Sequence, residues 1–251
     1  MTLTGKHALI TGGGTGIGLA IAKALRSAGA EVTITGRRAD VLDAAASAHG
    51  LQALVMDVQD EASVVDGIAR AVAQRGPVQI CVPNAGIAEG RALHKMDMAF
   101  WRTMMATNLD GTFLTIRESL KSMHQTDWGR VIAISSIAGL RGLKGAPCYT
   151  ASKHAMVGLI RGLAADYLGK PYTFNAICPA YVDTDIVPQN IDRIMARTGM
   201  TEDAARAVMV GANPHGRLIA PEEVAEAALW LCAPNSGSVN GQAIQIAGGE
   251  F

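Results

Sequence analysis

The chain has 251 residues, 49% of them hydrophobic, and its 22 lysine and arginine side chains balance 22 aspartate and glutamate side chains. A net charge of zero gives no electrostatic reason to expect nucleic acid or an anionic membrane surface as a partner. The sequence has no run of about 18 charge-free apolar residues that would predict a membrane span, and its amino terminus lacks the regions of a signal peptide. We therefore expect a cytoplasmic globular protein with one large domain or two small ones.

The cysteines and histidines indicate neither a disulfide framework nor a metal site. Four cysteines are scattered without CxxC spacing, at Cys81, Cys148, Cys178 and Cys232. Three of them lie in apolar runs, which predicts reduced core thiols and a reducing compartment. The six histidines show no ligand-like spacing, so we predict no metal centre.

Short β-rich runs alternate with longer helical patterns along the whole chain. The predicted strands are His7–Thr11, Glu31–Thr35, Ala53–Met56, Gln79–Val82, Arg130–Ser135, Thr173–Cys178 and Ala243–Ile246. The predicted helices are Gly16–Ala28, Ala39–Ala48, Glu61–Gln74, Ala99–Met123, Tyr149–Leu168 and Pro221–Leu231. Continuously apolar strands indicate a parallel sheet that is covered on both faces. The pattern thus predicts an α/β fold, one doubly wound Rossmann domain over residues 1–251, with a seven-stranded parallel sheet and ligands beyond the strands' carboxyl ends.

A glycine-rich turn links the first predicted strand to the first predicted helix. Glycines permit a close approach of the backbone, and a helix start offers free N–H groups and a positive dipole end, so this turn suits a pyrophosphate. The spacing of its glycines departs from the GxGxxG form, but the strand before it and the helix after it favour a dinucleotide site. The residues that we assign to cofactor binding here are Gly12, Thr15, Gly16, Ile17 and Gly18.

The second predicted strand runs into Thr35-Gly36-Arg37-Arg38, with no acidic residue at its end. In this position an acid would bind a ribose 2′-hydroxyl, whereas a basic residue would accept a 2′-phosphate. Arg37 is able to pair with a phosphate through two parallel hydrogen bonds. We therefore favour NADP(H) over NAD(H) and assign Arg37 and Arg38 to the cofactor, with the alternative that both arginines only occupy a solvated helix start.

Tyr149 and Lys153 carry the candidate chemistry, together with Ser136 thirteen residues before the tyrosine. Positions i and i+4 share one face of a helix, so the two side chains are expected to point into the same space. A nearby ammonium would favour the phenolate and lower the pKa of Tyr149 from its usual value of about 10. The alternative is one exposed aromatic side chain and one solvated lysine.

An interval of about forty residues between Cys178 and Pro221 interrupts the alternation of strands and helices. Two short helices are predicted within it, Asp185–Arg197 and Thr201–Ala212. A connection of this length in a compact domain is usually functional, so we interpret residues 183–217 as a lid over the substrate. The alternative is a surface excursion without a role.

With these motifs in order, the chain resembles the single-domain branch of the short-chain dehydrogenase/reductase family over essentially its whole length. The motifs that carry the resemblance are Thr11–Gly18, Asp57-Val58, Asn84-Ala85-Gly86, Asn108, Ser136, Tyr149-x-x-x-Lys153 and Pro179–Thr184. The resemblance implies that Tyr149 is the general acid/base and that Ser136 hydrogen-bonds the substrate oxygen, although Ser135 stands next to it. It also implies that Lys153 lowers the phenol's pKa and binds the nicotinamide ribose, and that Asn108 holds a water that links Lys153 to solvent.

The same resemblance implies further cofactor contacts. Asp57 and Val58 would flank the adenine, and Val182 and Thr184 would contact the carboxamide and the phosphates. The remaining residues that the resemblance places along the dinucleotide are Asn84, Ala85, Gly86, Tyr149, Lys153 and Pro179. Three positions depart from the family pattern, namely Pro83, Ala180 and Asp183.

Among family members, the chain looks most similar to 3-hydroxybutyrate dehydrogenases and 3-oxoacyl reductases. Those dehydrogenases hold a substrate carboxylate with a histidine and a lysine, and here the two positions are Ala138 and Ala146. We therefore expect an apolar substrate wall, formed by Leu140, Leu143, Tyr181, Val187 and Met195. Arg141 or Lys144 would meet an anionic group at the rim.

The sequence thus predicts an NAD(P)(H)-dependent oxidoreductase that acts on a secondary alcohol or ketone, with a 3-hydroxyacyl or other apolar carbonyl compound as the candidate substrate. The alternative is a catalytically silent dinucleotide sensor or scaffold on the same fold. A serine hydrolase is not indicated, because the chain has no GxSxG motif. The helices at 99–123 and 149–168 and the tail Gly241–Phe251 resemble surfaces of symmetric tetramers in the family, so we expect a homotetramer.

Overall fold

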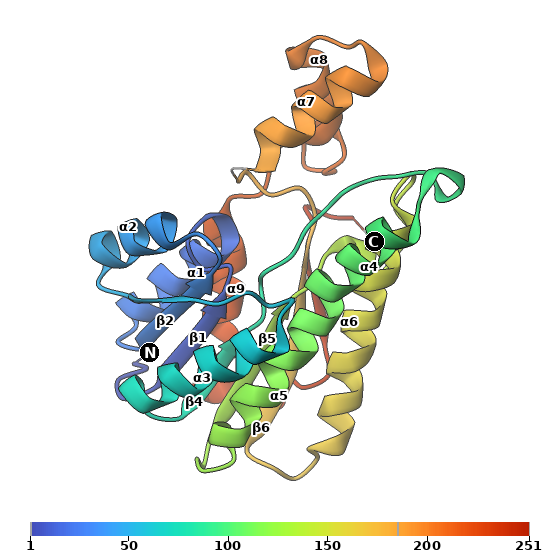
Figure 1. The fold of residues 1–251 in the computed structure, drawn as a ribbon. Helices are drawn as coiled ribbons and strands as arrows, with labels where there is room; N and C mark the ends of the chain where they lie inside the picture. The colour runs from blue at the N-terminus through green and yellow to red at the C-terminus, as the bar shows by residue number, and fades with distance from the viewer. Residues whose placement is uncertain (1, 185, 251) are drawn as a thin grey trace.

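A computed structural model of the chain describes residues 2–184 and 186–250. Within them, seven parallel strands form one sheet in the order β3-β2-β1-β4-β5-β6-β7 (Figure 1). The strands are β1 (His7–Thr11), β2 (Glu31–Gly36), β3 (Gln52–Val55), β4 (Val78–Val82), β5 (Gly129–Ile134), β6 (Tyr172–Pro179) and β7 (Ala243–Ile246). The predicted fold class is therefore confirmed. Each strand begins and ends within one residue of its predicted boundary.

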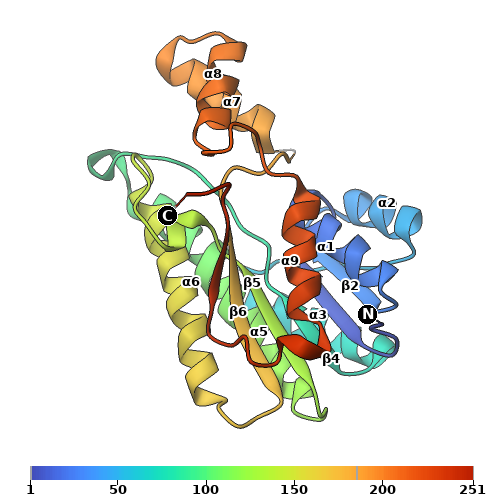
Figure 2. The same ribbon diagram turned by 180° about the vertical axis from the view of Figure 1, so that it is seen from behind.

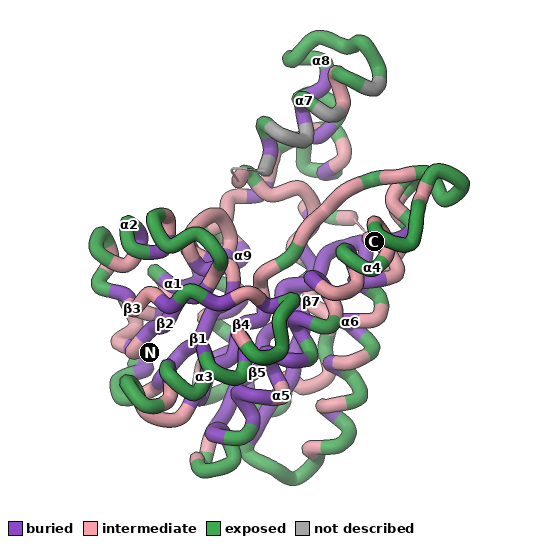
Figure 3. Tube along the Cα trace, viewed as in Figure 1, coloured by how far each residue is buried: buried purple, intermediate pink, exposed green. Residues whose placement is uncertain are grey.

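Helices cover both faces of the sheet (Figures 1 and 2). One face packs against α1 (Gly16–Ser27), α2 (Ala39–His49) and α9 (Pro221–Leu231). The other packs against α3 (Glu61–Arg75), α5 (Gly111–Met123) and α6 (Pro147–Asp166), with α4 (Met98–Met105) alongside α6. Two apolar cores result, one on each face, which explains why β1, β2, β4, β5 and β6 lack polar alternation and are buried along most of their length (Figure 3). The edge strands β3 and β7 are mostly half-buried.

The single helix predicted over Ala99–Met123 is wrong in one respect. The structure interrupts it with a π-helical segment, Ala106–Asp110, between α4 and α5. An extra residue in the turn changes which side chains face the sheet, and such turns occur frequently at functional sites. Here it lies around Asn108, which is completely buried.

The strand order reverses direction between β1 and β4, so that the chain runs outward to β3 on one side and to β7 on the other. At such a switch point the loops after neighbouring strands diverge and leave a crevice at the carboxyl ends. The loops after β1, β4, β5 and β6 carry the residues singled out from the sequence, so the topology brings them to one edge.

The long connection after β6 contains α7 (Ile186–Thr198) and α8 (Glu202–Gly211), as predicted, although the predicted start at Asp185 lies outside the described residues. The two helices stand away from the sheet in both ribbon views (Figures 1 and 2). They share a small core of their own, in which Val187, Ile191, Ala205 and Met209 are buried. Within the described ranges, none of the helices combines the length and the apolar character needed to cross a bilayer.

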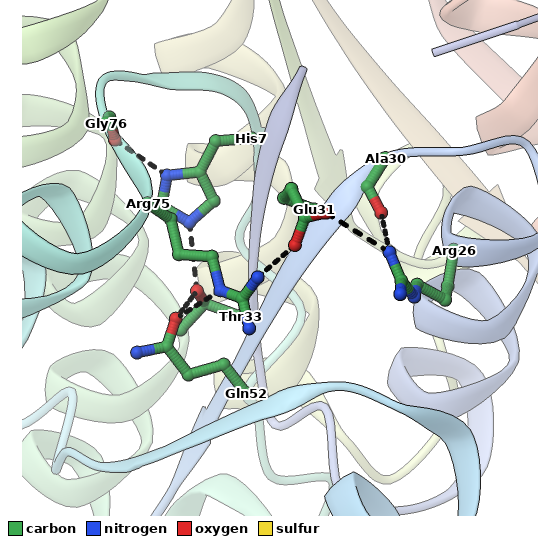
Figure 4. Close-up of polar contacts among 8 residues, drawn as sticks. All are labelled: His7, Arg26, Ala30, Glu31, Thr33, Gln52, Arg75 and Gly76. Atoms are coloured by element: carbon green, nitrogen blue, oxygen red, sulfur yellow. Dashed lines mark hydrogen bonds and ion pairs between the residues drawn. The ribbon is translucent and has the colours of Figure 1, made fainter. Parts of the chain in front are cut away.

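The amino ends of the strands, opposite the crevice, are joined by a polar network (Figure 4). The buried His7 ring contacts the Gly76 carbonyl through Nδ1 at 2.8 Å and the Thr33 hydroxyl through Nε2 at 2.9 Å. Thr33 in turn donates to Gln52, which also accepts from Arg75. These hydrogen bonds tie the amino ends of β1, β2 and β3 together, at the edge of the sheet opposite the crevice.

Candidate active site

The glycine-rich turn after β1 has the shape that a dinucleotide requires. Gly12 and Gly16 have φ angles of 63° and 52°, in the left-handed region that favours glycine. A Cβ on Gly18 would lie 2.4 Å from the Gly12 carbonyl oxygen, so no side chain fits there. The Asn84 carboxamide donates to the carbonyls of Thr11 and Gly12 at 2.9 and 3.2 Å, which joins the β4 loop to the turn.

The start of α1 is suited to an anion. Thr15 is the N-cap residue, and its side chain makes no capping hydrogen bond. The Thr15 side chain therefore does not occupy the first N–H groups of this helix, which can donate to a ligand instead. The helix dipole favours negative charge at the same point. The residues present thus fit the pyrophosphate of a dinucleotide.

Beside the turn lies a hollow of about 240 Å³ between the ends of β1, β2 and β3. Among the predicted cofactor residues, those that line it are Gly12, Thr15, Arg37, Arg38, Asp57, Val58, Ala85 and Gly86. Arg37 and Arg38 are exposed there, and neither forms an ion pair within residues 2–184 and 186–250. Asp57 accepts a hydrogen bond from the Gln59 N–H at 3.0 Å, so its carboxylate stabilises the local turn.

A second, larger cavity of about 620 Å³ opens beyond the ends of β5 and β6, under α7 and α8. Ile17, Pro179, Val182 and Thr184 of the predicted cofactor set line it, together with Ser136 and Tyr149. Gly16 does not line either space, but a Cβ at Gly16 would lie 3.2 Å from Thr184. Gly18 and Asn84 likewise support the turn rather than line a space.

Ser136, which the sequence favours, and its neighbour Ser135 have different surroundings. Both line the cavity, but the Ser135 hydroxyl donates to the Lys153 carbonyl at 3.2 Å. Ser136 caps the short 3₁₀ turn that follows β5 by accepting the Ala138 N–H at 3.1 Å, and its hydroxyl acts on the Tyr149 phenol by lowering the pKa of that group. The interaction with Tyr149 favours Ser136 over Ser135 as the candidate catalytic serine.

Lys153 lies one turn along α6 from Tyr149 and is only 4% exposed. Its Nζ donates to the Ile134 carbonyl at 2.9 Å and lies 5.8 Å from the centre of the Tyr149 ring. The two side chains thus share one space, as the i, i+4 spacing predicts.

Asn108 connects this helix to the loop after β4. Its carboxamide accepts the Ile87 N–H at 2.8 Å and donates to the Ser152 hydroxyl at 3.0 Å. A Cβ on Gly86 would lie 3.2 Å from Asn108 Oδ1 and 3.7 Å from Lys153 Nζ, so Asn108, Gly86 and Lys153 meet at one point.

The expected effect of Lys153 on Tyr149 is wrong for the protein alone. Burial raises the pKa of the Tyr149 phenol above its ordinary value, and the Ser136 hydrogen bond only partly offsets this rise. Burial also lowers the pKa of the Lys153 ammonium to about 8. Lys153 Nζ donates to a backbone carbonyl and not to the phenol, and desolvation is the largest cause of both pKa shifts.

The predicted apolar substrate wall is present in part. Leu143, Tyr181 and Val187 line the cavity, whereas Leu140 packs against the core and Met195 packs within the small core of α7 and α8. Of the two candidate cations, Arg141 forms an ion pair with Glu250 instead. Lys144 lines the cavity, is exposed, and forms no ion pair within the described ranges.

Several lining residues were missed by the sequence reasoning. They come from the loop after β4, from the segment between β5 and α6, and from the lid, and they are Ala88, Glu89, Gly90, Ile137, Gly145, Ile194, Val208, Met209 and Ala212. The loop residues give no sequence signal. Val208 and Met209 stand in a helical pattern that is equally typical of a core, so only the fold shows that they face the cavity.

Comparisons with known proteins agree with this geometry. The short chain dehydrogenase family matches residues 6–194. The acetoacetyl-CoA reductase of Rhizobium meliloti is 36% identical over 97% of this chain and 98% of the relative, and a D-beta-hydroxybutyrate dehydrogenase of Cupriavidus necator is 33% identical over 98% of each. The structure of a variant actinorhodin polyketide ketoreductase with NADPH superimposes with a TM-score of 0.94, at 31% identity, over 99% of this chain and 98% of the other.

The fold and the site define an oxidoreductase that binds a nicotinamide dinucleotide and acts on CH–OH groups or the corresponding ketones. The chain belongs to the short-chain dehydrogenase/reductase family.

Replacement of Lys153 by methionine tests the charge that this site buries. An ammonium whose pKa is about 8 in the folded chain and about 10.5 when unfolded destabilises the fold below pH 8, and this penalty disappears as the pH rises through that interval. We expect the stability of Lys153→Met relative to the native chain to fall by about 3 kcal/mol between pH 8 and pH 10.5. Urea unfolding at several pH values measures the difference, and a difference that does not change with pH would contradict the burial of this charge.

Proposed function

We propose that the protein reduces a ketone, or oxidises the corresponding secondary alcohol, with Tyr149 as the group that exchanges a proton with the substrate oxygen. The observation that carries the proposal is that Tyr149 and Ser136 interact and together line the larger cavity, next to Lys153. A hydroxyl and a phenol aimed at one point are the donors that a developing oxyanion requires.

Each polar residue of this group has a role that follows from its contacts. When bound, the dinucleotide supplies or accepts the hydride. The Tyr149 phenol, whose pKa is raised by burial, retains its proton near neutral pH and so is ready to donate it to a ketone oxygen. Ser136 orients that oxygen through its own hydroxyl. Lys153 and Asn108 lie deeper, where we infer that the ammonium binds the nicotinamide ribose and that Asn108 holds the water through which protons are resupplied.

We infer a preference for NADP(H) over NAD(H). Two arginines without ion-pair partners in residues 2–184 and 186–250 line the hollow at the end of β2, and no acidic residue ends that strand. A relative of known structure was solved with NADPH, which agrees with the inference. Pro179, Val182 and Thr184 would then contact the nicotinamide half, from the cavity side of the turn.

For the substrate, we propose an apolar 3-oxoacyl or similar carbonyl compound that carries an anionic group. A cavity of about 620 Å³ has room for a chain longer than that of a small hydroxyacid, and much of its lining is apolar. Lys144 is the residue that would meet the anionic group, because Arg141 is paired with Glu250. The names of two relatives, acetoacetyl-CoA reductase and 3-oxoacyl-[acyl-carrier-protein] reductase, agree with an acyl substrate.

We infer that residues 183–217 act as the substrate lid, since Val187, Ile194, Val208 and Met209 of this segment line the cavity. A homotetramer and a cytoplasmic location stay predictions of the sequence. A silent dinucleotide sensor is not favoured by any observation, because the proton-transfer residues are together in one place.

Replacement of Tyr149 by phenylalanine tests the proposed proton donor. The change removes one hydroxyl, so we expect kcat to fall by about a thousandfold while the Kd of the reduced cofactor changes little. Turnover is followed at the absorbance of the reduced cofactor, and binding by its fluorescence. Tyr167→Phe is the matched control, because that phenol contacts His124 outside the cavity. Retention of activity by Tyr149→Phe would refute the proposed mechanism.

Replacement of Arg37 by aspartate tests the cofactor preference. An aspartate repels a 2′-phosphate and accepts a ribose hydroxyl, so we expect the ratio of kcat/KM for NADPH to that for NADH to fall at least about a hundredfold. Arg70→Asp serves as the control, since that arginine pairs with Asp66 on α3 and does not line the hollow. Equal use of NADH and NADPH by the native protein would disprove the preference.

Replacement of Lys144 by methionine tests the anion contact. We expect KM for acetoacetyl-CoA to rise about fivefold, because one partly screened charge pair is lost. KM for the uncharged N-acetylcysteamine thioester of acetoacetate should not change, and Lys144→Arg should behave like the native protein. An equal effect of Lys144→Met on both thioesters would show that Lys144 does not recognise charge.

A further inference from the structure

A buried asparagine joins the two ends of the proposed lid. Asn213 follows α8, where the chain returns toward the sheet, and it is only 1% exposed. Its Oδ1 accepts the Tyr181 N–H at 3.1 Å, and its Nδ2 donates to the Tyr181 carbonyl at 2.9 Å and to the Arg217 carbonyl at 2.7 Å. Both amide hydrogens and the amide oxygen of this side chain are therefore used.

The Asn213 carboxamide pairs with Tyr181 as a neighbouring peptide group would. The same segment also forms a parallel bridge between Val182 and Ile219, in which the Ile219 N–H donates to the Tyr181 carbonyl at 2.9 Å. The outgoing end of the lid, just after β6, is thus joined to the returning end before α9. Because Tyr181 and Val182 line the cavity, this junction lies directly beside the substrate space.

The rest of the lid lies beyond this junction. In both ribbon views α7 and α8 stand away from the sheet and its covering helices (Figures 1 and 2). Their small core contains Val187, Ile191, Ala205 and Met209, and Tyr181 packs against it from the junction. A compact pair of helices attached at one place moves as a unit about that place.

We propose that Asn213 is a positioning residue that sets the orientation of the α7–α8 lid over the cavity and thereby the affinity for the ketone substrate. The proposal rests on the function inferred above for residues 183–217. If the lid is competent only in one orientation, the apparent Kd is the intrinsic Kd divided by the fraction of molecules in that orientation. The Tyr181 hydrogen bonds favour that orientation, so their loss weakens substrate binding without changing the proton-transfer residues.

The chain offers a matched control in Asn175. This side chain is fully buried on β6, and its carboxamide likewise bridges backbone groups, with Nδ2 donating to the Val239 carbonyl at 2.7 Å and Oδ1 accepting the Gln242 N–H at 3.0 Å. It joins β6 to the segment before β7 and does not line the cavity. Asn175→Ala therefore removes similar hydrogen bonds from a part of the fold that does not hold the lid.

The first experiment compares steady-state kinetics of Asn213→Ala, Asn175→Ala and the native protein with acetoacetyl-CoA and NADPH. We expect KM to rise about tenfold in Asn213→Ala, which corresponds to about 1.4 kcal/mol, with a smaller change in kcat and an unchanged Kd of NADPH. Asn175→Ala should lose stability but keep the native KM. A native KM in a folded Asn213→Ala variant overturns the proposal.

Asn213→Asp provides a second variant, since it retains an acceptor for the Tyr181 N–H but cannot donate to the two carbonyls. We expect its KM to rise at least as much as that of Asn213→Ala. A native KM in Asn213→Asp would show that the donor contacts do not position the lid, and would also overturn the proposal. The KM of Asn213→Asp therefore tests the proposal even if Asn213→Ala does not fold.

Amide hydrogen exchange supplies a readout that needs no activity. Exchange across residues 187–212 should become faster in Asn213→Ala than in the native protein, while exchange in β1, β4 and β5 stays the same. Asn175→Ala should not accelerate exchange in the lid. An inactive native protein, or an active Tyr149→Phe variant, would refute the proposed function, whereas unchanged lid exchange in Asn213→Ala would refute the role of Asn213 alone.

Discussion

The site is built around one costly interaction, the burial of the Lys153 ammonium under the loops at the carboxyl ends of the sheet. The side chain is 4% exposed, and the Ile134 carbonyl is its hydrogen-bond acceptor. Such a group is stable in a protein interior only when its surroundings hold it in place. Gly86 leaves room beside Nζ, and Ser135 bonds to the Lys153 carbonyl, so β4, β5 and α6 all converge on this point.

The same burial determines the electrostatics of the neighbouring phenol. Tyr149 and Lys153 both lose solvent, which favours the neutral form of each, so the pKa of the phenol rises while that of the ammonium falls to about 8. A protonated phenol beside the Ser136 hydroxyl is suited to donation toward a ketone oxygen. The π-helical turn around Asn108 belongs to the same arrangement, because it lets the carboxamide reach both Ile87 and Ser152.

Much of the fold follows from local patterns. The strands could be predicted closely because continuous apolar runs between glycine-rich turns have few other interpretations, and the helix pattern was equally clear for α1, α3 and α9. The predicted helix over Ala99–Met123 was wrong only at its π-helical segment, for which the sequence carries no periodic signal. The glycine turn, Arg37 and Arg38 were predicted as one site because the carboxyl ends of parallel strands meet at one edge.

The amino-acid sequence by itself determined the fold class, the family and the residues of the candidate catalytic group, since these depend on local periodicity and on motifs of fixed spacing. The tertiary structure decided that Lys144 and not Arg141 is free to meet an anionic group of the substrate. Arg141 pairs with Glu250, which lies more than a hundred positions away in the sequence. It also decided the direction of the Tyr149 pKa shift and revealed the contact between Asn213 and Tyr181. Burial and long-range contacts arise only when distant segments pack together, so no local pattern encodes them.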